Sequence, residues 1–288
     1  MKREASRQGK AKKVLGAAAL AALAAIAVWI ASFVPNADWY GTFHAAGRGL
    51  FRGESPYEQP LFVNPPWAAA LLVPFVLFPP AIARGLVLVT SVAGLIYFAW
   101  RMHAPKFAVV AFLLSPTVIA VMLAANLDAY ASLGMFLPPA GGLFLLLIKP
   151  QIGLGPAAFF ALDAWRTRGI GGVLRVFLPV SAAALVSALL FPVWVERILH
   201  MPAGIWNRSM FPFGIPIGLA GMWFAVRRRN AFLALAASPF LTPYISFPTY
   251  AIVQLGLMHP DVERVVRRDI LQVTLAVILW VLMLALRL

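Results

Sequence analysis

The polar stretch 35–66, PNADWYGTFHAAGRGLFRGESPYEQPLFVNPP, holds a first group of residues that could do chemistry. Asp38 lies directly after a long apolar run, so its carboxylate is expected near a membrane surface, where it could act as a general base. Four further polar side chains follow within about four helical turns: His44, Arg48, Arg52 and Glu54. The alternative is that these side chains are only the solvated face of a helix lying in the membrane surface.

Lys149 is a second candidate, because it interrupts the apolar stretch LLLIKPQIGLG at 145–155. A charge inside a membrane-spanning run is costly and indicates a functional site. The adjoining Pro150 and Gln151 predict a broken helix beside a polar cavity, where a lysine could bind a phosphate group. The alternative is that the lysine reaches the outer membrane surface and serves no ligand.

Weaker signals come from two other places. Asn126 and Asp128 allow the same argument as Lys149, but they lie near a predicted cytoplasmic end, which favours a structural role. Asn207 and Arg208 follow a tryptophan in a polar loop, a combination that suits contact with phosphate or sugar. An anchor in the membrane surface would fit the same residues.

Tyr244, Ser246 and Tyr250 lie on a segment broken by prolines. They could line a cavity, although packing in the protein core is the alternative. The four histidines are scattered and form no ligand pair, so no metal site is predicted, and a metal requirement stays open. No glycine motif for nucleotide phosphates and no GxSxG elbow is present.

Composition indicates the elements that must position these residues. The 288 residues are 62% hydrophobic and 12% charged, against about 45–50% and about 25% in soluble domains. The net charge of +14 could suggest nucleic acid, but the basic residues gather in short clusters between apolar runs, as in membrane proteins. With no cysteine, disulfides and thiolate chemistry are excluded.

The apolar runs predict an all-α polytopic membrane protein with roughly ten spans of about 20 residues each. Residues 1–13 form a basic cytoplasmic tail, and 14–288 form a single transmembrane domain. The run 14–34 is interpreted as a retained anchor rather than a signal peptide. The stretch 35–66 is then an external loop with an interfacial helix, and 194–213 is a second external loop.

Within this scheme 67–78 descends to a cytoplasmic turn at Pro79-Pro80, and 82–100 returns. The run 107–125 descends again, and Lys149 lies near the outer side. Arg84 is placed in the cytoplasm, together with the clusters at 166–175, 227–229 and 264–268. This orientation leaves more Lys and Arg in cytoplasmic than in external segments, as the positive-inside rule requires.

The same motifs, in order along most of the chain, resemble glycosyltransferase family 87. Asp38 with AAGRGLFRGESPY at 45–57 is similar to the family's first periplasmic loop, and NPPWAAALLVPFVLFPP at 64–80 to the segment after it. ANLDAYASLG at 125–134 and LLLIKPQIGLG at 145–155 resemble two later motifs. WNRSM at 206–210 and SPFLTPY at 238–244 resemble the last two.

The resemblance implies a GT-C fold, a polyprenyl-phosphate sugar as donor, typically a mannosyl one, and transfer on the outer side of the membrane. It implies that Asp38 is the catalytic base. The residues expected to bind substrate are Tyr40, His44, Arg48, Glu54, Tyr57, Asn64, Asn126, Asp128, Lys149, Gln151, Asn207, Arg208 and Tyr244. The chain differs from the family in its shorter length, in Ala125-Asn126 where the family has a GQ pair, and in its single first-loop acid.

These observations together predict a hexosyltransferase of the bacterial inner membrane, with the N-terminus in the cytoplasm. It would move mannose or another hexose to a lipid or glycan acceptor, with membrane lipids but no nucleic acid as partners. Two alternatives stay open. One is a non-catalytic membrane scaffold or lipid-binding subunit; the other is a transporter, which broken helices would suit.

Overall fold

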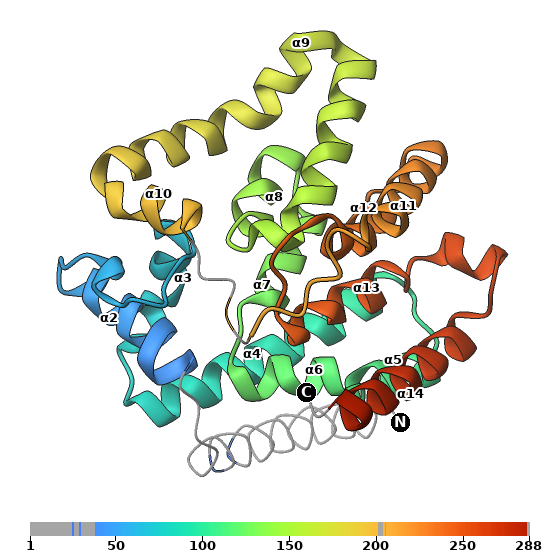
Figure 1. Ribbon diagram of the computed structural model, residues 1–288, viewed down its shortest axis with the longest axis horizontal. Helices are drawn as coiled ribbons and strands as arrows, with labels where there is room; N and C mark the ends of the chain where they lie inside the picture. The colour runs from blue at the N-terminus through green and yellow to red at the C-terminus, as the bar shows by residue number, and fades with distance from the viewer. Residues whose placement is uncertain (1–24, 26–28, 30–37, 201–203, 205, 287–288) are drawn as a thin grey trace, which may run out of the picture.

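A computed structural model of the chain describes residues 25, 29, 38–200, 204 and 206–286 (Figure 1). The predicted basic tail 1–13 and nearly all of the predicted first span 14–34 lie outside this part. Every element within it is a helix, and no strand occurs among these residues. The prediction of an all-α protein is confirmed for the described chain.

The first helices come from the polar stretch 38–66. A π-helix, η1 (Trp39–Phe43), continues into α2 (His44–Phe51), so the predicted short helix is present. A 3-10 turn, η2 (Pro56–Glu58), precedes α3 (Pro66–Val76). Gly47 lets α2 and α3 approach closely, because a Cβ there would lie 3.0 Å from the Cβ of Leu72.

Proline begins each of the next helices or directly precedes it, where its fixed φ suits a helix start. They are α4 (Pro80–Arg101), α5 (Lys106–Leu113) and α6 (Pro116–Ala124). The axes of α5 and α6 meet at 58°. Three short elements follow: α7 (Asp128–Leu133), η3 (Gly134–Phe136) and α8 (Pro139–Leu146).

The longest helix is α9 (Pro150–Leu190), and Gly169 divides it into two limbs. Gly169 has φ +62° and ψ −156°, a conformation that glycine adopts readily and other residues rarely. In Figure 1 the first limb leaves the centre of the molecule, and the second returns to α10 (Pro192–Leu199) beside α3.

The C-terminal part consists of two longer helices and several short elements. They are α11 (Ile215–Arg228), α12 (Ala231–Ala237), η4 (Ser238–Leu241), η5 (Phe247–Tyr250), α13 (Ala251–Gly256), η6 (Pro260–Arg264) and α14 (Arg268–Leu286). Close packing of α9 on α12 depends on Gly155, since a Cβ there would meet the carbonyl oxygen of Ala234 at 2.1 Å.

Three described helices are long and apolar enough to cross a membrane: Pro80–Arg101, Pro150–Leu190 and Arg268–Ala285. A fourth is possible if the bent pair α5 and α6 forms one span. In the most apolar window of α9 only 6% of residues are buried, so its apolar side chains face outward. Outward apolar surface on this scale is typical of contact with lipid.

The other predicted spans after residue 38 correspond to shorter helices, and the structure contradicts the predicted crossing at 67–78. The chain was expected to cross the membrane at 67–78, between Asp38 and Pro79-Pro80. However, Trp39 Nε1 donates to the Pro80 carbonyl at 3.0 Å, so the start of the polar loop and the turn that follows α3 lie at one level. The physical reason is length, because 11 residues extend only about 16 Å, and the hydrocarbon is about 30 Å thick.

Candidate functional site

The Lys149 side chain lies at the centre of a buried polar cluster. Its Nζ donates to Asn126 Oδ1 at 2.9 Å, to Asp128 Oδ2 at 2.9 Å and to Thr249 Oγ1 at 3.3 Å. All four residues are buried, Asp128 with 1% of its surface exposed. An ammonium group has three N–H donors, so each donor of Lys149 has an acceptor within the protein.

Local structure explains how these groups meet. Lys149 directly precedes α9, at the point where α8 has ended. Ala125 ends α6 in the left-handed region, with φ +48°, and the Asn126 side chain accepts from the Leu127 amide at 2.7 Å. Asp128 then begins α7, and a carboxylate is favourable at a helix N-terminus.

This cluster corrects the predicted placement of Lys149. The sequence places Asn126 and Asp128 near the cytoplasmic side and Lys149 near the outer side, with a membrane crossing between them. A separation of 2.9 Å between Lys149 Nζ and Asp128 Oδ2 excludes that crossing. The segment 126–149 is instead a hairpin of α7, η3 and α8, whose short helices return the chain to the same level.

One oxygen in the cluster has no partner. Asp128 Oδ1 is buried and makes no hydrogen bond within the described part of the chain. Gln151 Oε1, on the second residue of α9, also has no hydrogen-bond partner there, while the Gln151 carbonyl accepts from Ser238 Oγ at 2.8 Å. Buried polar atoms are nearly always paired, so two unpaired acceptors near one lysine distinguish this region.

Hydrogen bonds connect the cluster to the first polar loop. Asn64 is buried, and its Nδ2 donates to the Ile148 carbonyl at 2.7 Å. The Tyr57 hydroxyl donates to the Asn64 carbonyl at 2.8 Å, and Arg197 on α10 donates to the carbonyls of Tyr57 and Gln59. Tyr57 and Asn64, predicted to bind substrate, therefore serve to hold the loop against Lys149.

The second polar loop pairs with the segment 242–250. Asn207 Oδ1 accepts from the Ile245 amide at 3.1 Å, and its Nδ2 donates to the Pro243 carbonyl at 2.9 Å. The Arg208 amide donates to the Ile245 carbonyl at 2.6 Å, and the Tyr250 hydroxyl donates to the Arg208 carbonyl at 2.9 Å. Asn207 thus joins two segments of backbone, while the Arg208 side chain is exposed beside them.

Asp38 lies exposed at the start of η1 and close to Tyr244. Burial raises the pKa of Tyr244, and the negative charge of Asp38 raises it further. Tyr244 belongs to the segment 242–250, whose Thr249 binds Lys149. This single segment therefore lies near Asp38 and binds Lys149.

The other candidates on the first loop divide by exposure. Arg48 and Glu54 are exposed, in agreement with a solvated face. Tyr40 is partly exposed, and the guanidinium of Arg84 lies 5.9 Å from its ring centre. His44 differs from its predicted position on the polar face, because it is 5% exposed and its Nε2 has no hydrogen-bond partner among the described residues.

Two residues of this region were missed by the sequence reasoning. Thr249 lies between Ser246 and Tyr250, which were considered as cavity-lining, so its neighbours gave a partial signal. Arg84 was assigned to a cytoplasmic turn, but it is buried and donates to the Leu123 carbonyl at 2.6 Å. A basic residue four positions into an apolar run was the available signal for it.

Within the described residues, no group of three or more His, Asp and Glu side chains could hold a metal ion. Comparison with known proteins places no constraint on the site, since no family model, no curated protein and no solved structure matches the chain. The resemblance to glycosyltransferase family 87 therefore stays a prediction from the motifs.

Proposed function

We propose that the protein is a membrane glycosyltransferase that uses a polyprenyl-phosphate sugar and belongs to the GT-C type. The observation that carries the proposal is the buried cluster of Lys149, Asn126, Asp128 and Thr249, connected through segment 242–250 to the exposed carboxylate of Asp38. The buried ammonium of Lys149 suits a donor that carries a phosphate. The exposed carboxylate of Asp38 suits an acceptor that carries a hydroxyl.

The contacts between helices support one orientation. Arg268 donates to the carbonyls of Met102 and His103, which brings the end of α4 to the start of α14. Phe98 and Phe232 are in ring contact, so the end of α4 also lies near the start of α12. Basic residues are abundant at this side: Arg101, Lys106, Arg166, Arg168, Arg227, Arg228, Arg229, Arg264, Arg267 and Arg268.

The opposite side holds the polar loops and fewer basic residues, which are Arg48, Arg52, Arg84, Arg197 and Arg208. The positive-inside rule then assigns the Arg101 side to the cytoplasm and Asp38 to the outer face. Compared with the sequence prediction, Arg84 changes to the outer side, and Arg101 and Lys106 change to the cytoplasmic side. Both changes increase the bias toward a basic cytoplasmic face.

In the proposed reaction the Asp38 carboxylate takes the proton of an acceptor hydroxyl. The acceptor oxygen forms a bond to the anomeric carbon of the sugar, while the bond from that carbon to the phosphate oxygen breaks. The electron pair leaves with polyprenyl phosphate, and the configuration at the anomeric carbon inverts. Arg208, which is exposed on the loop that pairs with segment 242–250, supplies a positive charge at the phosphate. Lys149 is the other basic residue that could do so.

Lys149 can contribute to phosphate binding in a limited way. Two of its donors are held at 2.9 Å by Asn126 and Asp128, and the third contact, to Thr249, is longer at 3.3 Å. The third donor is the one that a phosphate oxygen could share most easily. Lys149 also fixes segment 242–250 through Thr249, and thereby positions the residues near Asp38.

The test is sugar transfer from a radiolabelled polyprenyl-phosphate mannose by purified protein in mixed micelles. We expect Asp38→Asn to lower the rate about 10²–10⁴-fold, the usual contribution of a general base. Glu58→Gln is the matched control, because Glu58 is an exposed acid on the same loop, and it should leave the rate nearly unchanged. Equal rates for wild type and Asp38→Asn, in protein of unchanged elution volume, would refute the assignment.

One observation favours the second candidate, a lipid-binding subunit without catalysis. Asp128 neutralises Lys149 within the protein, so the cluster carries no net positive charge to attract a phosphate. Mass spectrometry of co-purifying lipids separates the two functions. A polyprenyl-phosphate sugar that accumulates on Asp38→Asn supports the transferase, whereas bulk phospholipid alone on both proteins supports the lipid-binding subunit.

A further inference from the structure

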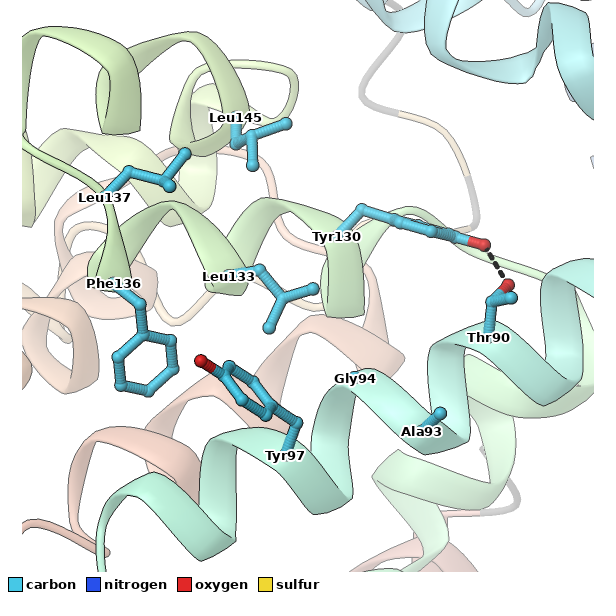
Figure 2. A pocket seen from close by; sticks show the side chains of 9 residues that line it. All are labelled: Thr90, Ala93, Gly94, Tyr97, Tyr130, Leu133, Phe136, Leu137 and Leu145. Carbon is cyan, nitrogen blue, oxygen red and sulfur yellow. Dashed lines mark hydrogen bonds between the residues drawn. The ribbon is translucent and has the colours of Figure 1, made fainter.

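An open groove of about 510 Å³ lies beside α4, and none of the residues that line it belongs to the Lys149 cluster. Figure 2 shows α4 on one side of the groove and α7, η3 and α8 on the other. Its lining is mostly apolar, and it consists of Thr90, Ala93, Gly94, Tyr97, Tyr130, Leu133, Phe136, Leu137 and Leu145. Tyr97 and Leu137 are 41% and 45% exposed, so the groove opens outward.

The groove is compatible with hydrocarbon along its length. At one end the hydroxyls of Thr90 and Tyr130 pair with each other at 2.5 Å (Figure 2). Their polar atoms are therefore satisfied without water. Gly94 forms the floor of the groove, where α4 and α7 pack closely, since a Cβ added there would lie 3.3 Å from Leu133. The channel above this floor is therefore shallow. Because α4 is one of the candidate spans, the channel faces the lipid phase.

The other end of the groove carries a positive charge. Arg101 is the last residue of α4, and its guanidinium lies 4.9 Å from the ring centre of Phe136 and donates to the Tyr97 hydroxyl at 2.8 Å. Both rings line the groove. The Arg101 side chain is exposed, and among the described residues no carboxylate lies within ion-pair distance of it.

The position of Arg101 matches the level of lipid headgroups. Trp100, next to it, is 66% exposed, and exposed tryptophan and tyrosine near a span end are typical of the membrane surface. The neighbouring residues Met102 and His103 are bound by Arg268 at the basic end of α14. An exposed arginine at this level attracts the headgroups of anionic lipids, which are most abundant in the cytoplasmic leaflet.

We propose that this groove binds one anionic phospholipid, with an acyl chain along α4 between Thr90 and Tyr97 and the phosphate at Arg101. The charge at one end and the apolar channel behind it are complementary to that amphipathic molecule. The site is separate from Asp38 and Lys149, and the proposal does not depend on glycosyl transfer.

The test is native mass spectrometry of delipidated full-length protein titrated with phosphatidylglycerol or phosphatidylcholine. We expect wild type to retain phosphatidylglycerol more strongly than phosphatidylcholine. Arg101→Gln should weaken phosphatidylglycerol binding about fivefold, the usual effect of one basic residue at an anionic membrane surface. Lys106→Gln is the matched control, since Lys106 is an exposed base near the same end of α4, and it should change binding much less.

A second variant tests the channel itself. Ala93→Phe would fill the groove from an exposed position, so folding should be unaffected, and binding of both lipids should fall. Val110→Phe, at a 54% exposed position on α5, is its control. Equal retention by wild type, Arg101→Gln and Ala93→Phe would overturn the proposal. A polyprenyl phosphate that Ala93→Phe displaces, while phosphatidylglycerol stays bound, would also overturn it.

Discussion

Neutralising Asp128 should destabilise the protein strongly, because the Lys149–Asp128 pair is buried. The side chains are only 10% and 1% exposed, so Asp128→Asn leaves an ammonium ion in the protein interior with no counter-charge. Removing one partner of a buried ion pair usually lowers the free energy of unfolding by about 3–5 kcal/mol. Lys149→Met should have a cost of the same size, because it leaves the Asp128 carboxylate uncompensated.

The double variant gives the sharper expectation. In the Lys149→Met background, Asp128→Asn removes the uncompensated carboxylate and should therefore increase stability, although the same change lowers it in wild type. Asp269→Asn is the matched control, because Asp269 forms a shorter ion pair, at 2.7 Å, with the exposed Arg267. Exposed pairs contribute little, so this variant should scarcely change unfolding.

The assay is reversible unfolding in mixed detergent micelles, followed by tryptophan fluorescence. The four proteins of the cycle are wild type, the two single variants and the double variant. If Asp128→Asn lowers the free energy of unfolding equally with and without Lys149, the two side chains are not coupled. That result would refute the reasoning that the buried charges compensate each other.

Three further expectations concern other parts of the fold. Gly155→Ala should lower the free energy of unfolding by about 1–3 kcal/mol, because the added Cβ would clash with the Ala234 carbonyl. The measurement is unfolding in the same micelles, and an unchanged free energy would contradict the close packing of α9 on α12. The pKa of His44 is lowered by burial and then by Arg48, so the unfolded chain binds more protons and stability should fall as pH drops below about 6.5. His44→Gln should reduce that pH dependence in unfolding curves; an unaltered slope would show that His44 is not the cause. Arg197→Ala should speed chymotrypsin cleavage at Tyr57, whose carbonyl Arg197 binds, while Arg208→Ala should not.

The sequence predicted helical elements better than it predicted their length. The polar segment around His44 and Arg48 was expected to form a short helix, and α2 is present there. The run at 67–78 is equally apolar whether it crosses a membrane or lies against α2, so hydropathy could not distinguish the two. The decision depended on a tertiary hydrogen bond, from Trp39 to Pro80.

The same limit applies to the candidate site. Lys149 and Asp128 were each singled out as polar residues within apolar runs, and the structure brings them together. Their pairing could not be deduced, because it depends on whether 126–149 crosses the membrane or turns back. The chain turns back between η3 and α8, where Gly134 and Gly142 lie so close that a Cβ on either would clash with the other's carbonyl oxygen, and hydropathy does not indicate such a close approach. Whether Asp38 acts as a base remains a prediction.

The break at Gly169 determines where the end of α9 lies relative to its start. An unbroken helix of 41 residues would be about 60 Å long, twice the thickness of the hydrocarbon layer. With the break, the second limb of α9 turns back toward α3 (Figure 1). Arg197 is thereby delivered to the loop that Asn64 joins to Ile148. A single backbone conformation thus decides where the end of α9 lies relative to its start.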